Sequence, residues 1–576
     1  MLFTSRALAG GVNFTSCLAN VQNFYNDTSN QKYANYSQLN NSLLDNNGFP
    51  VAFADIFTST AITYTVCTNW CGSGDESFEW TNFSQQFSAW LLPYLALLSQ
   101  LPFGARYRSD NLMSAVLTAG SPTLAGYTLF CTMLNTRWIS QSFESVRKFP
   151  NTAQAARVLS NLQQVPLRVN PHSAMLSSLV VLPENDQWWS EFSESLNYKN
   201  TWSISAAVSI AWVIVAYALT VADSLANVND NIDSVGQSIG TAFLWLIPVV
   251  IGWQQLSPKC DFDRLSRAFD HSEAKAYIAT HHGSVKVGEL TEERAISIGP
   301  EAMEDVMSPD EDATPPIFNY SRVFGWSRSA EEVLRAFQYA SKRAFVHKPV
   351  DPEREWEVGD GESIHPGNRH GAPYDVEMYC GRMRFEPSSW GSGVWGRIVF
   401  ASVAGLMLQW GTTGGAVMMV WFTPTTKLGC RSFSYLIYGA LSTIIWMLML
   451  ASSIAAHHAS SFHWNEHKRY RDAAFHTWKT VADVLRWSGK ALAVLNSLIL
   501  CAIPILQFSN VFNNCYCNSS VMGRGPDRAY NVINLTDTSE TQILWIVALV
   551  VASLCSIAFV AIFNLLTDTL AFNRDS

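Results

Sequence analysis

Charged side chains are scarce in this chain of 576 residues, of which Asp, Glu, Lys and Arg make up 15%. Typical soluble domains have about a quarter. Basic residues are outnumbered by acidic ones, 38 to 47, which argues against nucleic-acid binding because that function needs a positively charged surface. Catalytic signatures are scarce too, since there is no P-loop and no kinase motif set. These absences disfavour an ordinary soluble enzyme.

The chain does contain a series of long apolar segments without charge. Segments of roughly 18 or more residues can cross a bilayer core, and those of this kind are 111–134, 201–221, 237–256, 398–422, 434–455, 491–508 and 543–565. The segment 88–103 is shorter. Buried helices of soluble proteins rarely lack a polar face over such lengths. We therefore predict an all-α fold, a polytopic helical bundle in a lipid bilayer.

Asn-x-Ser/Thr sequons mark the parts of the chain expected outside the membrane. They crowd residues 1–86 and recur in 509–540, which predicts glycosylation at Asn13, Asn26, Asn35, Asn40, Asn82, Asn518 and Asn534. Residues 456–490 are rich in Lys and Arg, which the positive-inside rule places in the cytoplasm. The long acidic loop 257–393 has one sequon, at Asn319, and is also expected inside.

If 1–86 and 509–540 are both outside, an even number of crossings separates them. An odd number of candidate segments lies between them, so one does not cross. The suspects are the short segment 88–103 and the segment 111–134, whose middle contains Pro122, a residue that disrupts helices. We predict about seven crossings plus one possible re-entrant segment, with the N-terminus outside and the C-terminus inside.

This topology divides the chain into a glycosylated outer tail, two membrane helix groups, a large inner loop and a short cytoplasmic tail. The expected bounds are 1–86, 87–256 with an inner loop at 135–200, 257–393, 394–565 and 566–576. Within the large loop, the acidic and Pro-containing stretch 301–316 predicts a disordered linker. A capping-box pattern that begins at Ser329 predicts a short helix near 330–346.

Cysteines are concentrated on the expected outer side. An even number in an oxidising compartment predicts disulfides, with Cys17, Cys67, Cys71, Cys430, Cys515 and Cys517 as candidates. The connectivity stays open, although Cys515 and Cys517 are too close in sequence to pair comfortably with each other. Together with the sequons, these cysteines indicate a small disulfide-bearing outer region and a plasma or secretory-pathway membrane.

Two interrupted apolar segments are candidates for a substrate or ion site at membrane depth. Their polar or helix-breaking residues are Pro122, Gln409, Thr412 and Thr413, and Asn496 is a further polar residue at depth. The alternative is that the Gly and Thr residues simply let helices pack closely. No acid or base lies within the apolar segments, which disfavours a proton pump but not a channel lined by carbonyls and hydroxyls.

The segment from His463 to His467 matches the inverted zinc-protease pattern His-x-x-Glu-His. In that reading His463 and His467 bind zinc and Glu466 acts as the general base. A basic, aromatic helix next to the membrane is the favoured alternative, because so short a match arises readily in a His-rich loop. No cofactor is therefore expected.

Leu101 to Gly104, Asn111 to Tyr127 and Gln409 to Ser432 resemble a group of uncharacterised multi-pass membrane proteins of filamentous fungi. The resemblance covers the membrane part and implies a fungal membrane protein, without an activity or functional residues. The residues themselves favour a non-enzymatic transport, channel-like or sensing role. The alternatives are a scaffold or receptor that binds a cytoplasmic protein through 257–393, and a membrane metallohydrolase.

Overall fold

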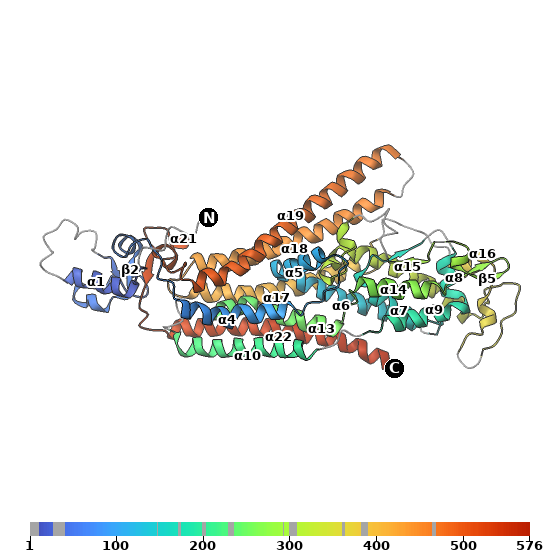
Figure 1. Ribbon diagram of the computed structural model, residues 1–576, viewed down its shortest axis with the longest axis horizontal. Helices are drawn as coiled ribbons and strands as arrows, with labels where there is room; N and C mark the ends of the chain where they lie inside the picture. The colour runs from blue at the N-terminus through green and yellow to red at the C-terminus, as the bar shows by residue number, and fades with distance from the viewer. Residues whose placement is uncertain are drawn as a thin grey trace.

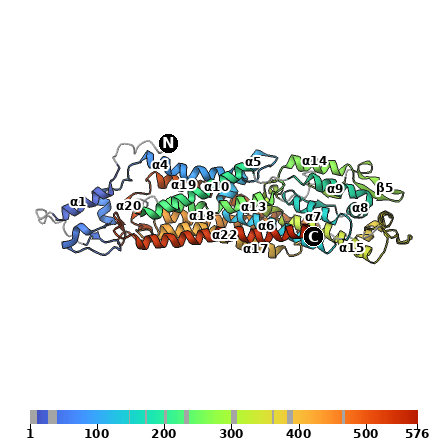
Figure 2. The same ribbon diagram turned by 90° about the horizontal axis from the view of Figure 1, so that it is seen from below.

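The protein is elongated and mostly helical, with three parts in a row along its long axis (Figures 1 and 2). We call them the cap (the described residues within 11–79 and 509–538), the bundle, and the base domain (the described residues within 139–198 and 257–381). The computed structural model describes residues 11–26, 41–146, 148–170, 174–198, 203–228, 236–291, 293–298, 308–359, 363–381, 390–463 and 468–575.

The cap combines the beginning of the chain with the segment before the last helix. Its antiparallel sheet has the order β1 (Leu43–Leu44), β2 (Ala61–Thr63) and β7 (Tyr530–Val532). Around the sheet lie α1 (Phe14–Asn26), α3 (Tyr64–Val66), α20 (Cys515–Asn518) and α21 (Val521–Arg524). The predicted outer tail therefore does not fold by itself, because its sheet is completed from residues 530–532.

Six helices of the described residues are long and apolar enough to cross a membrane. They lie in α10 (Ile204–Ala226), α12 with α13 (Gly236–Phe243 and Leu246–Leu256), α17 (Val394–Phe422), α18 (Cys430–His463), α19 (Lys468–Phe508) and α22 (Ser539–Asp575). Large apolar side chains point outward from these helices, among them Leu219, Leu498 and Ile557. An apolar outer surface needs a non-aqueous environment, so the helical bundle fits a membrane protein, as the sequence predicts.

Successive long helices run in opposite directions between the cap and the base domain (Figure 1). The helix α4 (Trp80–Leu98) leads from the cap towards the base domain, and α10 returns beside it. The end of α10 lies at the cap end, where Gln542 at the start of α22 donates a hydrogen bond to the carbonyl of Leu225. The helices α12 and α13 then lead back, followed by α17, α18, α19 and α22 in turn.

The apolar segment 111–134 is not one helix but two, α5 (Arg108–Gly120) and α6 (Pro122–Glu144). The loop before α5 lies at the base domain, because the amide of Phe262 donates to the carbonyl of Gly104 at 3.3 Å. The end of α5 lies inside the bundle, where Gly120 abuts the backbone of Ala493. From there α6 leads back into the base domain, so the α5–α6 hairpin enters and leaves the bundle on the same side.

The base domain is built from both segments that the sequence suggests as separate inner loops. Its helices are α7 (Thr152–Asn161), α8 (Met175–Val181), α9 (Asp186–Ser195), α14 (Phe262–Glu273), α15 (Asn319–Phe345) and α16 (Pro373–Tyr379). Two small antiparallel pairs join β3 (Arg168–Val169) to β6 (Ile296–Ser297) and β4 (Tyr277–Thr280) to β5 (Gly283–Lys286). Buried Trp189, Phe143 and Phe337 belong to one core, which both segments supply.

The acidic stretch predicted as a disordered linker is ordered over its described part, residues 308–316. It contains the 3-10 turn η8 (Pro309–Glu311) and leads into a second turn, η9 (Pro316–Phe318). Asp310 and Thr314 are buried there. The helix that the sequence places near 330–346 begins earlier, at Asn319. Composition is a poor guide here because contacts with the rest of the protein, described below, hold these polar residues in place.

Replacing Trp326 by Ala tests whether the two segments form one cooperative core. The Trp326 side chain is 2% exposed and donates to the carbonyl of Leu159 at 3.0 Å. We expect a loss of about 3–5 kcal/mol of stability, and limited proteolysis should then cut residues 148–198 and 257–359 together. Replacing the exposed Tyr339 of the same helix by Ala is the matched control. Cleavage confined to one segment would contradict a shared core.

Candidate functional site

The break between α5 and α6 lies halfway through the bundle. Pro122 has no amide hydrogen and restricts the residue before it, so the helix ends at Ser121 and a new one begins with Pro122 in its first turn. The Ser121 hydroxyl accepts a hydrogen bond from the amide of Leu124 at 3.2 Å and caps α6. The same hydroxyl donates to the carbonyl of Ser442 in α18 at 2.8 Å.

A cluster of polar side chains surrounds this break, and we call it the tip cluster. The Ser442 hydroxyl lies 3.4 Å from that of Ser121, 3.3 Å from that of Thr123 and 3.2 Å from Oε1 of Gln409. The Gln409 amide nitrogen in turn donates to the hydroxyl of Thr413 at 2.9 Å. All five side chains are buried. One hydroxyl proton cannot serve three acceptors at once, so the tip cluster has several hydrogen-bond arrangements of similar geometry.

The carbonyls at the end of α5 are satisfied by side chains of other helices. Asn496 of α19 donates to the carbonyl of Gly120 at 2.7 Å and to that of Tyr438 at 3.0 Å. The Tyr438 hydroxyl donates to the carbonyl of Ala119 at 2.9 Å. These bonds replace the helical partners that the break removes. The carbonyl oxygen of the Asn496 side chain has no hydrogen-bond partner among the described residues.

The tip cluster lies level with the centre of the bundle. Gly405 of α17 packs directly on the backbone of Thr123, and a Cβ added there would lie 2.5 Å from the Thr123 carbonyl oxygen. Gly411 of the same helix packs on Cys555, near the middle of the apolar stretch 543–565 of α22. The helices therefore approach closely beside the break, and the five side chains of the tip cluster are fully buried, so the site is closed in this structure.

The structure brings together only some of the site residues that the sequence predicts. Pro122, Gln409 and Thr413 meet at the break, whereas the Thr412 hydroxyl bonds back to the carbonyl of Leu408 in its own helix at 2.9 Å. Ser442 and Tyr438 were missed because they lie in α18, whose sequence has no Pro or Gly cluster to single it out.

A second cluster, of charged residues, lies where the bundle meets the base domain. Lys490 of α19 and the hydroxyl of Tyr320 both donate to the carboxylate of Asp310, which is 3% exposed. Arg486, one helical turn along α19, donates to the hydroxyl of Ser308 at 3.0 Å and pairs with Asp483 at 2.9 Å. The apolar segment 491–508 contains no charge, but its helix α19 begins at Lys468 and so includes Arg486 and Lys490.

Arg322 of α15 holds the same region from the base-domain side. Its guanidinium donates to the carbonyl of Gln163 at 3.1 Å, to that of Glu311 at 3.2 Å and to the side chain of Asn319 at 2.6 Å. Burial lowers the pKa of Arg322 to about 10. Burial also raises the pKa of Glu311, partly offset by Arg168, which lies 3.1 Å from it. The buried charges of Arg322 and Glu311 thus each have a partner, as a low-dielectric site requires.

The zinc-protease motif lies mostly outside the described residues. His463 is the last residue of α18, and 464–467, which include Glu466 and His467, are not described. The neighbouring His457 packs on Trp390 at 4.4 Å, and His458 packs on Trp478 at 4.8 Å. Over the described residues, no three His, Cys, Asp or Glu side chains are grouped to hold a metal ion. The metal site stays a prediction without structural support.

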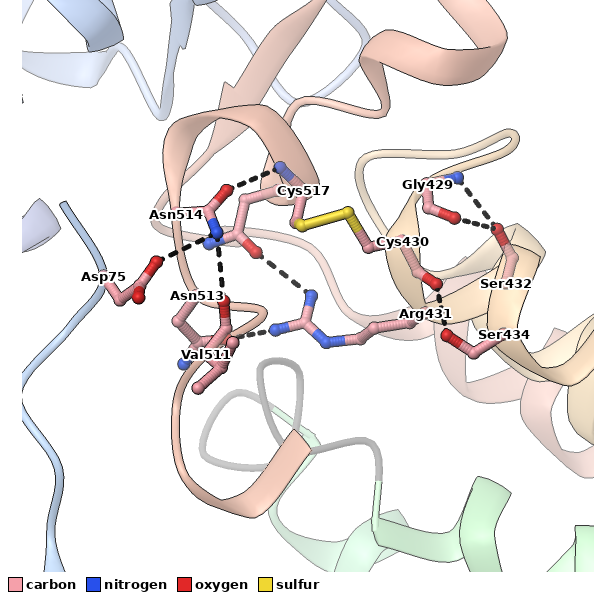
Figure 3. The surroundings of a disulfide bond; sticks show 11 residues. Asp75, Gly429, Cys430, Arg431, Ser432, Ser434, Val511, Asn513, Asn514 and Cys517 are labelled. Carbon is pink, nitrogen blue, oxygen red and sulfur yellow. Dashed lines mark hydrogen bonds between the residues drawn. A yellow bond between two sulfur atoms is a disulfide. The ribbon is translucent and has the colours of Figure 1, made fainter. Parts of the chain in front are cut away.

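The six candidate cysteines form three pairs at the cap end of the molecule, five of them in the cap and Cys430 at the start of α18. The pairs are Cys17–Cys71, Cys67–Cys515 and Cys430–Cys517. Figure 3 shows the last of them beside Arg431, whose guanidinium donates to the side chains of Asn513 and Asn518. A disulfide thus attaches the start of α18 to the loop before α22, and the adjacent Asn side chains fix the same contact.

The predicted glycosylation sites have different surroundings. Asn26 and Asn534 are exposed, whereas Asn13 caps α1 by accepting from the amide of Ser16 at 2.8 Å. Asn518 accepts from Arg431 at 3.0 Å and is partly covered. Asn35, Asn40 and the side chain of Asn82 lie outside the described part of the chain. Glycosylation stays a prediction at all seven positions.

No family model, curated protein or solved structure matches this chain. The resemblance to fungal membrane proteins therefore stays a prediction.

Replacing Ser442 by Ala tests whether the tip cluster holds the hairpin. The change leaves buried groups on Thr123 and Gln409 without their shared partner, so we expect a loss of about 1–3 kcal/mol and a lower Tm in detergent. Ser434 to Ala is the matched control in the same helix, because that hydroxyl bonds only to the carbonyl of Cys430 in its own turn. Equal Tm values for the two variants would show that the tip cluster adds no stability.

Proposed function

We propose that this chain is an integral membrane protein with the cap outside and the base domain in the cytoplasm. Seven crossings follow if α4 is added to the six long apolar helices. The three cysteine pairs support an oxidising compartment for the cap, and hence a plasma or secretory-pathway membrane. In this orientation the α5–α6 hairpin is a re-entrant segment that enters from the cytoplasmic side.

Within this membrane protein, we infer a non-enzymatic transport or channel-like role centred on the tip cluster. The observation that carries it is the helix break at Ser121, at mid-depth and surrounded by hydroxyl and amide groups. Non-helical backbone at membrane depth occurs only where protein buries it or where it lines a water-filled cavity, and broken helices commonly form the substrate or ion sites of transporters.

The chemistry of the tip cluster indicates the class of solute. Hydroxyl, amide and backbone carbonyl oxygens can replace part of the water around a small cation or a neutral polar solute. No charged side chain belongs to the tip cluster itself, which disfavours a large anion. Because the polar groups bond to one another in this structure, passage requires that they exchange those bonds for bonds to the solute.

Cysteine labelling tests the re-entrant hairpin. On a background without the free cysteines, we would place a reporter at Ser109, at Ser190 or at Thr58. All three positions are exposed. If α5 and α6 enter and leave on one side, an impermeant thiol reagent added to intact cells labels Thr58→Cys only. Both other reporters should react after permeabilisation.

A hairpin that actually crosses would separate the two inner reporters. Labelling of Ser109→Cys in intact cells, with Ser190→Cys protected, would show that 111–134 spans the membrane and would remove the re-entrant segment. The Thr58 reporter serves as the positive control for the outside.

Flux in proteoliposomes tests the transport role, with Na⁺, K⁺, H⁺ and glycerol as probes. We expect Gln409→Leu to change the flux of at least one probe by about tenfold, equivalent to ~1.4 kcal/mol in the barrier. Thr412→Val is the matched control and should leave the flux unchanged. Thr412 lies one helical turn from Gln409, and its hydroxyl bonds only within its own helix. No flux above protein-free liposomes for any probe, or the same flux in both variants, would contradict the role.

A scaffold or receptor role is the second candidate. It is favoured by the charged contacts that join α19 to the base domain, because such contacts can carry a change in the bundle to a cytoplasmic surface. Exposed apolar side chains on that domain, including Phe345 and Tyr374, offer a surface for a protein partner. This role predicts that the protein functions without flux of any probe in proteoliposomes. It also predicts that replacing Phe345 and Tyr374 by Ser abolishes that function.

A further inference from the structure

Residues 308–318, which we call the plug, fill the space where the hairpin and α19 meet the base domain. Thr314 is buried and its hydroxyl donates to the carbonyls of Cys260 at 2.5 Å and Gly104 at 3.2 Å. Those two residues follow α13 and precede α5. The plug is thus seated against the cytoplasmic ends of two bundle elements at once, and it also reaches α19 through Asp310.

The contact between Asp310 and Lys490 lies close below the tip cluster. Ala493, whose backbone abuts Gly120 at the end of α5, is one helical turn further along α19 than Lys490. At 1.5 Å per residue, the separation along the helix is about 4.5 Å. Any solute that reaches the tip cluster from the cytoplasm beside α5 and α19 must therefore pass the plug.

The charges around this contact are nearly balanced. Lys490 and Arg486 face it from α19, and Asp310 faces it from the plug. Asp110 of α5 lies within electrostatic range of both Lys490 and Asp310, and Asp483 pairs with Arg486. A buried ion pair is stable when both partners are in place, and a single remaining charge costs about 3–5 kcal/mol. If the plug leaves as a unit, water reaches both charges, so the seated and released states can each be stable.

We propose that the plug is the cytoplasmic gate of the pathway through the tip cluster, and that the Asp310–Lys490 ion pair locks it. The role of the plug as a gate rests on the proposed transport function. The Asp310–Lys490 lock can be tested without measuring flux. The hydroxyl of Tyr320, as the second donor to Asp310, supports the lock from the base-domain side. The structure is then the closed state, with the plug seated and the tip cluster bonded to itself.

Cys260 offers a readout without any measurement of flux, because the plug's Thr314 binds its backbone carbonyl while its thiol donates to the carbonyl of Phe103 at 3.5 Å. It is buried, and burial raises its pKa to about 12, so it reacts slowly with maleimides while the plug is seated. We would replace the other free cysteines, Cys131, Cys380, Cys501 and Cys555, by Ser and keep the three cap pairs. The measured quantity is the rate of Cys260 labelling in full-length protein in nanodiscs.

Breaking the lock should speed the labelling. We expect Lys490→Gln to raise the rate at least about tenfold, as the loss of a buried partner implies. The charge-swapped pair, Asp310→Lys with Lys490→Asp, should restore a rate within about twofold of the parent. Lys479→Gln is the matched control, because Lys479 lies on the same helix and stacks on Phe475 instead of contacting the plug. Each variant must first elute as a single species with its cap cysteines unreactive.

Tyr320→Phe keeps the test decisive if Lys490→Gln fails to fold. It removes one donor to Asp310 and should raise the labelling rate by a smaller factor. Equal labelling rates in the parent and in both variants would overturn the gate, whatever the flux experiment shows. Faster labelling in these variants without flux of any probe would keep the lock and reject the transport role, leaving the plug as a coupling device between bundle and base domain.

Discussion

The carbonyl groups at the end of α5 set the main constraint on this bundle. They point into an apolar interior, where an unpaired backbone carbonyl is costly and water cannot reach it. Tyr438 and Asn496 supply the missing donors from two different helices. The hairpin can therefore stop halfway only because α18 and α19 are placed to receive it, and the glycines of α17 allow the close packing that this placement needs.

The membrane helices were predictable because their signal is local. Of the seven long apolar segments, six fall in helices long and apolar enough to cross a membrane. Pro122 correctly marks the seventh segment, 111–134, as a broken helix. The base domain was not predictable in the same way. Residues 308–316 look like a linker by composition, yet Asp310 and Thr314 are buried by partners that are distant in sequence.

The candidate site shows the same division. Gln409 and Thr413 stand out in sequence because a Gly and Thr cluster interrupts an apolar run, and they do meet the break. Ser442 lies in an ordinary apolar helix and becomes important only through its neighbours. Lys490 lies directly before the apolar segment 491–508, where the sequence alone does not single it out. Its importance depends on α19 continuing far beyond the apolar stretch and on Asp310 arriving from a remote segment.

The cap has a consequence for the order of events during synthesis. Cys67 and Cys515 are separated by 448 positions, and β2 pairs with β7 from the same late segment. Translation must therefore deliver nearly the whole polypeptide before the early half of the cap finds its partners. Until then the first cysteines stay exposed to wrong pairing. A chain that ended before residue 509 would leave β2 without β7 and Cys67 without Cys515.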